Sequence, residues 1–337
     1  MILNNLKNFT NVFKNRPILC NYYVTYRCNA RCVFCDFWQR EDYKHSQDAG
    51  LKEVIRNLQD LRRMGVIFVD FTGGEPLLNK DLPQMLKEAK RLGFITSVTT
   101  NTILYPGRAQ QLKGLVDILH FSLDSLNPKR LNTLRGVPVF ERLMESIDLA
   151  LSLGEKPDLL FTVTAQNAKE MPQLVTFAQK RKLLLVTNPV FSYFGNTGIS
   201  ESALKYIEIF QNASYVYVNR AYHHFIRSGG NQRGNPRCRG VSSTVVISPQ
   251  NELLLPCFHH RSQTIPIGTS LPEALNSKQR REALKNQGRY SFCQNCTINC
   301  YFDPSFLYKR DPYFYLSVWP KLKYEFEKTF QRTIRTE

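Results

Sequence analysis

Three cysteines near the start of the chain have the spacing of a shared metal site. Cys28, Cys32 and Cys35 form a C-x3-C-x2-C pattern. A structural zinc site normally takes a fourth ligand, and the nearest candidate, His45, lies ten residues further on in a polar stretch. A [4Fe–4S] cluster tolerates the missing ligand, because three cysteines bind three irons and leave the fourth iron open. The triplet therefore favours a catalytic cluster, with zinc or buried thiols as the alternatives.

A second group of five cysteines lies toward the end of the chain. One [4Fe–4S] cluster needs four thiolates, so this group predicts a single closed cluster. A zinc site with four cysteine ligands is the alternative, because a C-x2-C pair beside a hairpin also suits zinc. The expected ligands are Cys238, Cys257, Cys293 and Cys296, and Cys300 competes with them for a place.

A glycine pair accompanies the first cysteine group. The segment Thr72-Gly73-Gly74-Glu75-Pro76 directly follows a β-rich run. Two glycines let the backbone approach a ligand closely, and a carboxylate or carbonyl beside them accepts hydrogen bonds from an ammonium group. Taken alone, the segment is typical of a turn. Its place beside the three cysteines predicts a ligand site.

Alternating β-rich and helical segments must position these groups. Between residues 20 and 190, β-rich runs alternate with apolar residues at three- and four-residue steps, which are typical of helices packed on a sheet. This order predicts a parallel sheet, either a barrel or doubly wound. Ligands then gather where the strands end. The expected strands are residues 22–25, 66–71, 94–99, 118–123, 159–164 and 183–187.

The alternation stops after residue 190. Residues 244–255 predict a hairpin that ends near the second cysteine group, and residues 271–287 suit a helix. The tail, residues 301–337, holds eleven aromatic residues with Lys and Arg between them. Packing on the rest of the chain is one interpretation of this tail, and an interfacial surface or a lid over an apolar substrate is the other. Residues 1–13 have the same alternatives.

The cysteine triplet, with Phe34 before its third member, resembles the signature of the radical S-adenosylmethionine (radical SAM) superfamily. Gly73, Gly74 and Glu75 resemble the glycine motif of that family, which supports the SAM ammonium. The resemblance implies a partial (β/α)6 barrel and a [4Fe–4S] cluster that binds SAM. It also implies reductive cleavage of SAM to a 5′-deoxyadenosyl radical, hydrogen abstraction from a substrate, and a reductant protein such as flavodoxin or ferredoxin.

Further SAM contacts are implied by polar residues that follow the later strands. Arg135 suits a carboxylate, because a guanidinium binds that group through two parallel hydrogen bonds. Each of these positions is also compatible with a helix cap or a turn. The expected cofactor-binding residues are Phe34, Gly73, Gly74, Glu75, Asn101, Ser122, Arg135 and Asn188.

The late cysteines resemble the auxiliary-cluster extensions called twitch and SPASM domains. The full SPASM pattern carries seven cysteines for two clusters, so five imply one auxiliary cluster. We expect an N-terminal extension at residues 1–16, a radical SAM core at 17–215 and an auxiliary-cluster module, a β-hairpin plus a helix, at 216–337. His259 and His260 are expected to be either substrate-side groups or residues of the hairpin end.

The composition of the chain limits its binding partners and its location in the cell. A chain of 337 residues is long enough for about two domains. Its net charge of +17 attracts anionic partners, but the basic residues form no blocks, so no specific nucleic-acid binding is expected. No apolar run approaches the roughly 18 residues of a spanning helix, and the first residues do not resemble a signal peptide. We expect a cytoplasmic protein, with peripheral contact at the inner membrane face as an added hypothesis.

The sequence therefore predicts a radical SAM enzyme whose substrate is unidentified, with a small molecule, a lipid or a tetrapyrrole favoured. A maturase of ribosomal peptides is one alternative, although no dedicated peptide-binding domain is apparent at the N-terminus. A metal-stabilised nucleic-acid-binding protein and an iron–sulfur electron carrier are the others. Formation of 5′-deoxyadenosine would separate the enzyme from both non-catalytic alternatives.

Overall fold

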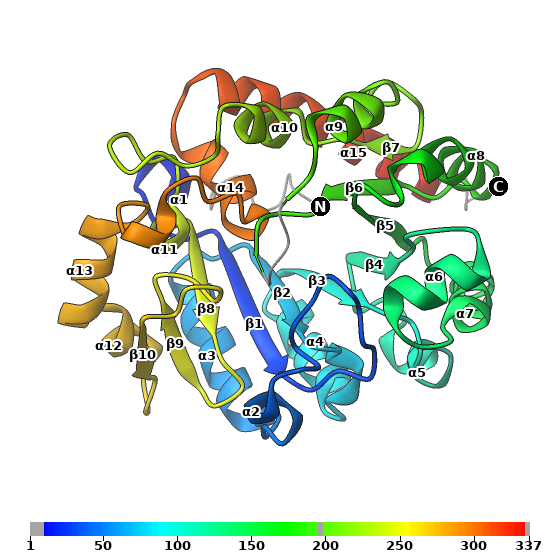
Figure 1. Ribbon diagram of the computed structural model, residues 1–337. Helices are drawn as coiled ribbons and strands as arrows, with labels where there is room; N and C mark the ends of the chain where they lie inside the picture. The colour runs from blue at the N-terminus through cyan, green and yellow to red at the C-terminus, as the bar shows by residue number, and fades with distance from the viewer. Residues whose placement is uncertain (1–9, 194–197, 334–337) are drawn as a thin grey trace.

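The computed structural model describes residues 10–193 and 198–333, and the side chains of residues 330–333 are not described. The chain forms one ten-stranded sheet with the order β10-β9-β8-β1-β2-β3-β4-β5-β6-β7 (Figure 1). The strands are β1 (Leu19–Thr25), β2 (Phe68–Gly73), β3 (Ile95–Thr100), β4 (Ile118–Ser122), β5 (Asp158–Val163), β6 (Leu185–Pro189), β7 (Val216–Tyr217), β8 (Thr244–Ile247), β9 (Glu252–Leu255) and β10 (Gln263–Pro266).

Helices follow most of the parallel strands and cover the curved sheet (Figure 1). Each of the main ones buries an apolar face, as the three- and four-residue periods predict. The α-helices are α1 (Thr10–Phe13), α2 (Glu41–Lys44), α3 (Leu51–Arg63), α4 (Leu82–Arg91), α5 (Tyr105–Leu112), α6 (Pro128–Arg135), α7 (Phe140–Ser152), α8 (Met171–Arg181), α9 (Glu201–Glu208), α10 (Arg220–Arg227), α11 (Gly240–Ser243), α12 (Leu271–Leu275), α13 (Lys278–Asn286), α14 (Asn299–Ser305) and α15 (Pro312–Thr333). The 3₁₀ helices are η2 (Pro76–Leu78), η3 (Ala168–Glu170), η4 (Ser291–Cys293) and η5 (Phe306–Tyr308).

The predicted α/β class and the mostly parallel sheet are confirmed. Strands β1 to β7 run parallel to their neighbours, in chain order. In the first pair, Tyr23 lies beside Thr72 and Thr25 beside Gly73, so both strands end at the same edge. This register places the segment that carries the first cysteines next to the segment that carries the glycine pair.

The C-terminal part joins this sheet directly. Strand β8 pairs in parallel with β1, and the hairpin of β8 and β9 continues outward to β10. Strand β7 lies just beyond residue 215, where we expected the first domain to end, and it pairs with β6. The sheet therefore continues past the expected boundary. The single helix expected at 271–287 is two helices, because the Ser277 hydroxyl caps a new helix by accepting a hydrogen bond from Arg280 N. Most of the expected N-terminal extension lies outside the described residues.

Within the described ranges 10–193 and 198–333, no helix combines the length and the hydropathy that a membrane crossing needs.

Candidate functional site

The glycine pair holds the start of the first cysteine loop. Gly74 N donates to Thr25 O at 3.1 Å, and Glu75 N donates to Arg27 O at 2.9 Å. A Cβ on Gly74 would lie 2.3 Å from the Arg27 carbonyl oxygen, so only glycine permits this approach. The pair therefore brings the end of β2 against the residue that immediately precedes Cys28.

The end of helix α6 holds the other side of the loop. Arg31 N donates to Arg135 O at 2.9 Å, and Val33 N donates to Leu134 O at 3.0 Å. Gly136 ends the helix with a φ of 65°, where a Cβ would come within 2.3 Å of Arg31 O. The loop that carries the three cysteines is thus fixed by backbone bonds from two directions.

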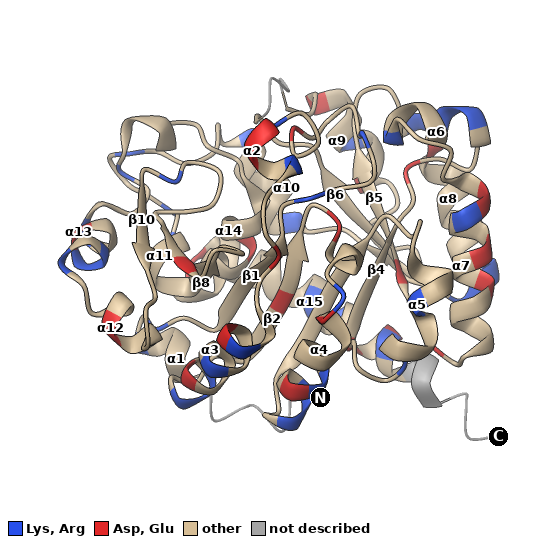
Figure 2. Cartoon of the chain, turned by 90° about the horizontal axis from the view of Figure 1, so that it is seen from below, with Lys and Arg blue, Asp and Glu red and all other residues tan. Residues whose placement is uncertain are grey.

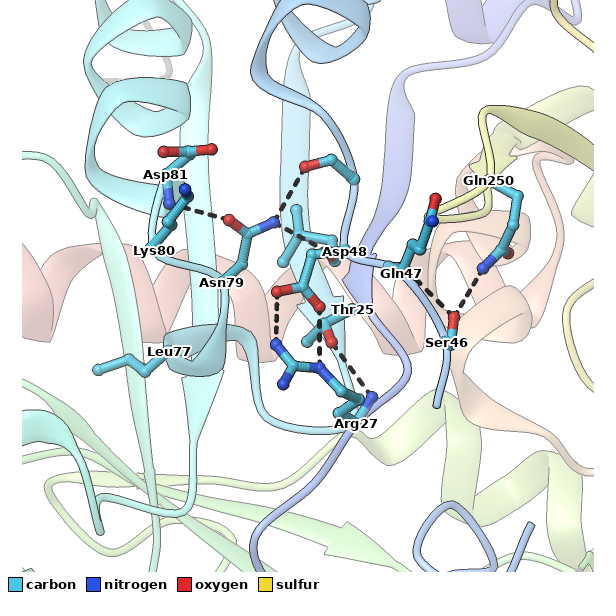
Figure 3. A network of polar contacts seen from close by, with 12 residues as sticks. Thr25, Arg27, Ser46, Gln47, Asp48, Leu77, Asn79, Lys80, Asp81 and Gln250 are labelled. Atoms are coloured by element: carbon cyan, nitrogen blue, oxygen red, sulfur yellow. Dashed lines mark hydrogen bonds and ion pairs between the residues drawn. The ribbon is translucent and has the colours of Figure 1, made fainter. Parts of the chain in front are cut away.

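A polar network supports the outer flank of the same loop (Figure 3). Arg27 forms an ion pair with Asp48 at 2.6 Å. Asn79, at the end of η2, donates to Val24 O at 3.0 Å and to Ala49 O at 3.2 Å. The network joins the end of β1, the segment before α3 and the turn after the glycine pair.

Hydrogen-bond donors lie against the cysteine sulfurs. Ala30 N approaches Cys28 Sγ at 3.4 Å, and Arg135 Nη1 approaches Cys32 Sγ at 3.6 Å. Burial raises the pKa of the Cys28 and Cys35 thiols to about 12, so without a metal these groups stay protonated. A bound metal deprotonates coordinating thiols. Three thiols in one loop, with nearby donors and a buried cation, fit an anionic iron–sulfur cluster.

Arg135 depends on a carboxylate that the sequence analysis did not single out. Its guanidinium pairs with Asp124 at 2.5 Å, and neither side chain is more than 8% exposed. Asp124 also accepts a hydrogen bond from Thr162 N at 2.9 Å. The guanidinium lies 5.3 Å from the centre of the Phe34 ring. The sequence feature that could have identified Asp124 is its position just beyond β4, two residues after Ser122. Ser122 itself is buried at the end of that strand.

The Glu75 carboxylate accepts hydrogen bonds from neighbouring segments of the protein. It accepts hydrogen bonds from Leu77 N at 3.1 Å, Thr100 Oγ1 at 2.8 Å and Asn101 N at 2.8 Å. Burial raises its pKa to about 7, although these three bonds oppose the rise. The side chain thus joins β2 to β3. Direct support of the SAM ammonium by Glu75 stays a prediction.

Asn101 and Asn188, two other predicted cofactor-binding residues, lie in different places. Asn101 lies against the first loop, where its amide donates to Asn29 Oδ1 at 2.7 Å and approaches Cys28 Sγ at 4.0 Å. Asn188, at the end of β6, instead accepts a hydrogen bond from Asn299 Nδ2 of α14 at 3.2 Å. Asn188 therefore contacts the helix that carries the last cysteine.

Four of the late cysteines surround one pocket. This pocket has a volume of about 420 Å³, part of it open to solvent, and Cys300 is not among the described residues that line it. Cys300 lies on α14 and is exposed, yet burial of its thiol raises the pKa to about 12, and the charge of Asp70 on β2 adds to the rise. The cysteines of the pocket are Cys238, Cys257, Cys293 and Cys296.

A buried asparagine organises this second group. The Asn231 side chain donates to Gly288 O at 2.8 Å and to Cys293 O at 3.0 Å. Its oxygen accepts from Arg237 N at 3.0 Å and from Cys238 N at 3.2 Å, and its backbone N donates to Cys296 O at 3.0 Å. The composition of this segment predicts only a loop, because it does not show that one residue binds two cysteine segments.

Aromatic rings join the two cysteine groups. Phe258, the residue after Cys257, stacks on Tyr23 at 4.1 Å and on Phe37 at 5.4 Å between ring centres. Phe37 lies two residues beyond Cys35. The rings therefore pack the segment that follows Cys257 against the segment that follows Cys35.

His259 and His260 lie in different surroundings. Burial lowers the pKa of His259 to about 3, and its ring packs edge-on against Tyr193 at 4.7 Å. His260 stacks on Phe292 at 4.7 Å and lines the four-cysteine pocket. One is therefore a hairpin-end residue within an aromatic group, and the other lies beside the second cysteine group.

In the part of the chain that the structure describes, no three His, Cys, Asp or Glu side chains converge closely enough to hold a single metal ion. A cluster has a different requirement, because each cysteine binds a separate iron.

Comparisons with known proteins show what this chain is similar to. Residues 22–178 match the model of the radical SAM superfamily. A probable GTP 3′,8-cyclase of Methanocella arvoryzae is 30% identical over 177 residues, which cover 51% of this chain and 56% of the relative. A GTP 3′,8-cyclase of Petrotoga mobilis is 32% identical over 167 residues, which cover 48% and 51%. The chain thus spans about half the length of these curated relatives.

Solved structures share the fold over most of the chain. SuiB of Streptococcus suis, bound to S-adenosylmethionine, aligns with a TM-score of 0.68 and 19% identity, covering 92% of this chain and 80% of SuiB. Native anSMEcpe with bound AdoMet aligns with a TM-score of 0.61 and 14% identity, covering 95% and 99%. The superfamily implies a [4Fe–4S] cluster and SAM. Residues 22–178 of the chain therefore resemble a radical SAM superfamily domain.

Proposed function

We propose that the chain cleaves SAM reductively at the Cys28, Cys32 and Cys35 loop and abstracts a hydrogen atom from a bound substrate. The observation that carries this proposal is the fixing of one three-cysteine loop between the glycine pair and the end of α6. When bound there and reduced by an external carrier, a [4Fe–4S] cluster would supply the one electron that cleaves SAM to methionine and a 5′-deoxyadenosyl radical.

The chain's own residues hold and shield that centre. The three thiolates are the proposed ligands, and Arg135 offsets their negative charge while donating to Cys32. Asp124 keeps the guanidinium in place. Gly74 and Glu75 orient the loop, since both backbone amides bind its first residues.

The second cysteine group is proposed to hold one auxiliary [4Fe–4S] cluster, with Cys238, Cys257, Cys293 and Cys296 as ligands. Four thiols around a shared pocket support this arrangement. A zinc ion with four cysteine ligands is the alternative. With all its irons ligated, such a cluster would support electron transfer or structure rather than bind substrate.

The substrate stays open in this proposal. Partial similarity to GTP 3′,8-cyclases supports a small-molecule substrate, whereas the fold shared with SuiB, which has also been solved with its precursor peptide SuiA, favours a peptide. A lipid or a tetrapyrrole also remains within the proposal. The proposed reductant is a carrier such as flavodoxin or ferredoxin, and the net charge of +17 suits an acidic one.

The test is SAM cleavage by the reconstituted protein. Iron and sulfide are restored without oxygen, SAM and a strong reductant are added, and 5′-deoxyadenosine is quantified. The wild type should form it, and the variant with Cys28, Cys32 and Cys35 changed to Ala should not. Cys20→Ala, a buried cysteine of β1 outside both groups, is the matched control and should retain the reaction. Product from the triple variant would overturn the assignment.

A further inference from the structure

Helix α15 presents its apolar side chains outward. Among residues 312–329 of this helix, the exposed ones are Pro312, Tyr315, Trp319, Leu322, Phe326 and Thr329, and none is charged. Steps of three and four residues place them on one face of the helix. The solvent side of α15 is therefore an apolar stripe, the reverse of the usual surface helix.

The charged residues of the second half of α15 are turned toward the protein. Lys321 pairs with Asp303 at 2.6 Å, and Lys323 donates to Val216 O at 3.0 Å. Lys328, which is 5% exposed, donates to Lys156 O at 2.8 Å and pairs with the buried Asp158. These internal partners fix the rotation of the helix, so the apolar stripe cannot turn inward without leaving buried charges unpaired.

The stripe is large for a surface feature. Tyr315, Trp319, Leu322 and Phe326 are 66%, 64%, 58% and 72% exposed. At roughly 200 Å² for a large side chain, they present on the order of 500 Å² together. This area is comparable to the largest apolar patch of a typical monomer, and such patches are often functional.

We propose that this face of α15 docks the protein on an anionic lipid bilayer surface. Aromatic residues such as Tyr, Trp and Phe suit the boundary between headgroups and acyl chains. The net charge of +17 favours an anionic surface, and basic residues lie on many elements of the chain (Figure 2). Exposed Lys309 and Arg310 stand just before the helix.

A second copy of the chain fits this face less well. Two facing stripes would bury on the order of 1,000 Å², which is at the lower limit of a specific interface. Two chains of charge +17 also repel each other across so small a contact. Both arguments favour a lipid surface over self-association.

The test is co-sedimentation of the reconstituted full chain with lipid vesicles. One set contains equal parts of phosphatidylglycerol and phosphatidylcholine, and the other contains phosphatidylcholine alone. The wild type should sediment with the anionic set and should be released by high salt. The double variant Trp319→Ser, Leu322→Ser should bind about tenfold more weakly or worse. Ile209→Ser, which removes another exposed apolar side chain from the end of α9, is the matched control and should bind like the wild type.

Retained formation of 5′-deoxyadenosine shows that the double variant is folded, and this reaction should not change. Failure of the wild type to sediment with anionic vesicles would overturn the proposal, as would unchanged binding of the double variant. Light scattering provides the remaining outcome: a dimer that the double variant abolishes, without vesicle binding, would assign the face to a second copy.

Discussion

The two cysteine groups are held in place by different means. In the first, three cysteines share one loop, and backbone amides of neighbouring segments fix that loop from both sides. In the second, four cysteines from three segments line one pocket, and Asn231 binds the segments of Cys238, Cys293 and Cys296. The first group therefore relies on strand ends and glycines, and the second relies on one buried side chain.

This difference has a chemical consequence. A single loop with three thiols leaves one side free for another ligand, as a catalytic centre requires. Four thiols around a pocket enclose what they bind. The same contrast predicts that damage to one group spares the other, and the variants below test that independence.

The largest effect is expected from Arg135→Ala. It removes the partner of a fully buried Asp124, and breaking a buried ion pair typically costs about 3–5 kcal/mol of unfolding free energy. Urea unfolding gives this value, and 5′-deoxyadenosine formation should fall with it. Asp124→Asn in the same chain should restore part of the stability. Arg142→Ala, which breaks the exposed Arg142–Glu145 pair of α7, should cost about 1 kcal/mol or less. Equal losses from Arg142 and Arg135 would contradict the role given to the buried pair.

Asn231→Ala should damage the second group specifically. It leaves buried backbone groups of three segments without partners, for a loss of roughly 2–4 kcal/mol. Iron analysis should show loss of the auxiliary cluster while SAM is still cleaved. Asn235→Ala in the same loop replaces an exposed residue and should leave both clusters intact. Loss of SAM cleavage alone would show that the two groups are not independent.

Gly74→Ala is the corresponding change in the first group. The added methyl meets the Arg27 carbonyl, and overpacking of this kind costs about 1–3 kcal/mol. SAM cleavage should fall while the auxiliary cluster is retained. Gly234→Ala has open space around the new methyl and serves as the control. An active Gly74→Ala enzyme would show that the close backbone approach is dispensable.

The smallest effect is expected from Cys300→Ala. Cys300 does not line the four-cysteine pocket, so the auxiliary cluster should persist, with a change in unfolding free energy below about 1 kcal/mol. Cys257→Ala should lose the cluster. If Cys300→Ala lost the iron and Cys257→Ala retained it, Cys300 would be the ligand and Cys257 would not.

Much of the fold followed from local patterns. The alternation of apolar periods predicted the parallel sheet, and a three-cysteine spacing is readable because its members lie within eight residues. Pairing of β8 with β1 was not predictable in the same way, because the paired residues Cys20 and Val245 lie 225 positions apart and no local pattern records which strands become neighbours.

Long-range polar partners were also missed. Asp124 and Asn231 bind residues that are distant in the chain. Because nothing near them in the sequence shows these partners, both resemble ordinary turn residues. Glu75 shows the opposite case. Its motif is visible in the sequence, but only the structure reveals that its carboxylate binds Thr100 and the backbone of Leu77 and Asn101.

The most direct measurement compares two cysteine-deficient variants in one SAM cleavage assay with iron analysis. The variant without Cys28, Cys32 and Cys35 should hold about four irons and form no 5′-deoxyadenosine. The variant without Cys238, Cys257, Cys293 and Cys296 should also hold about four irons and should still form it. Product from the first variant, or none from a second variant that retains its iron, would contradict the assignment of catalysis to the N-terminal loop.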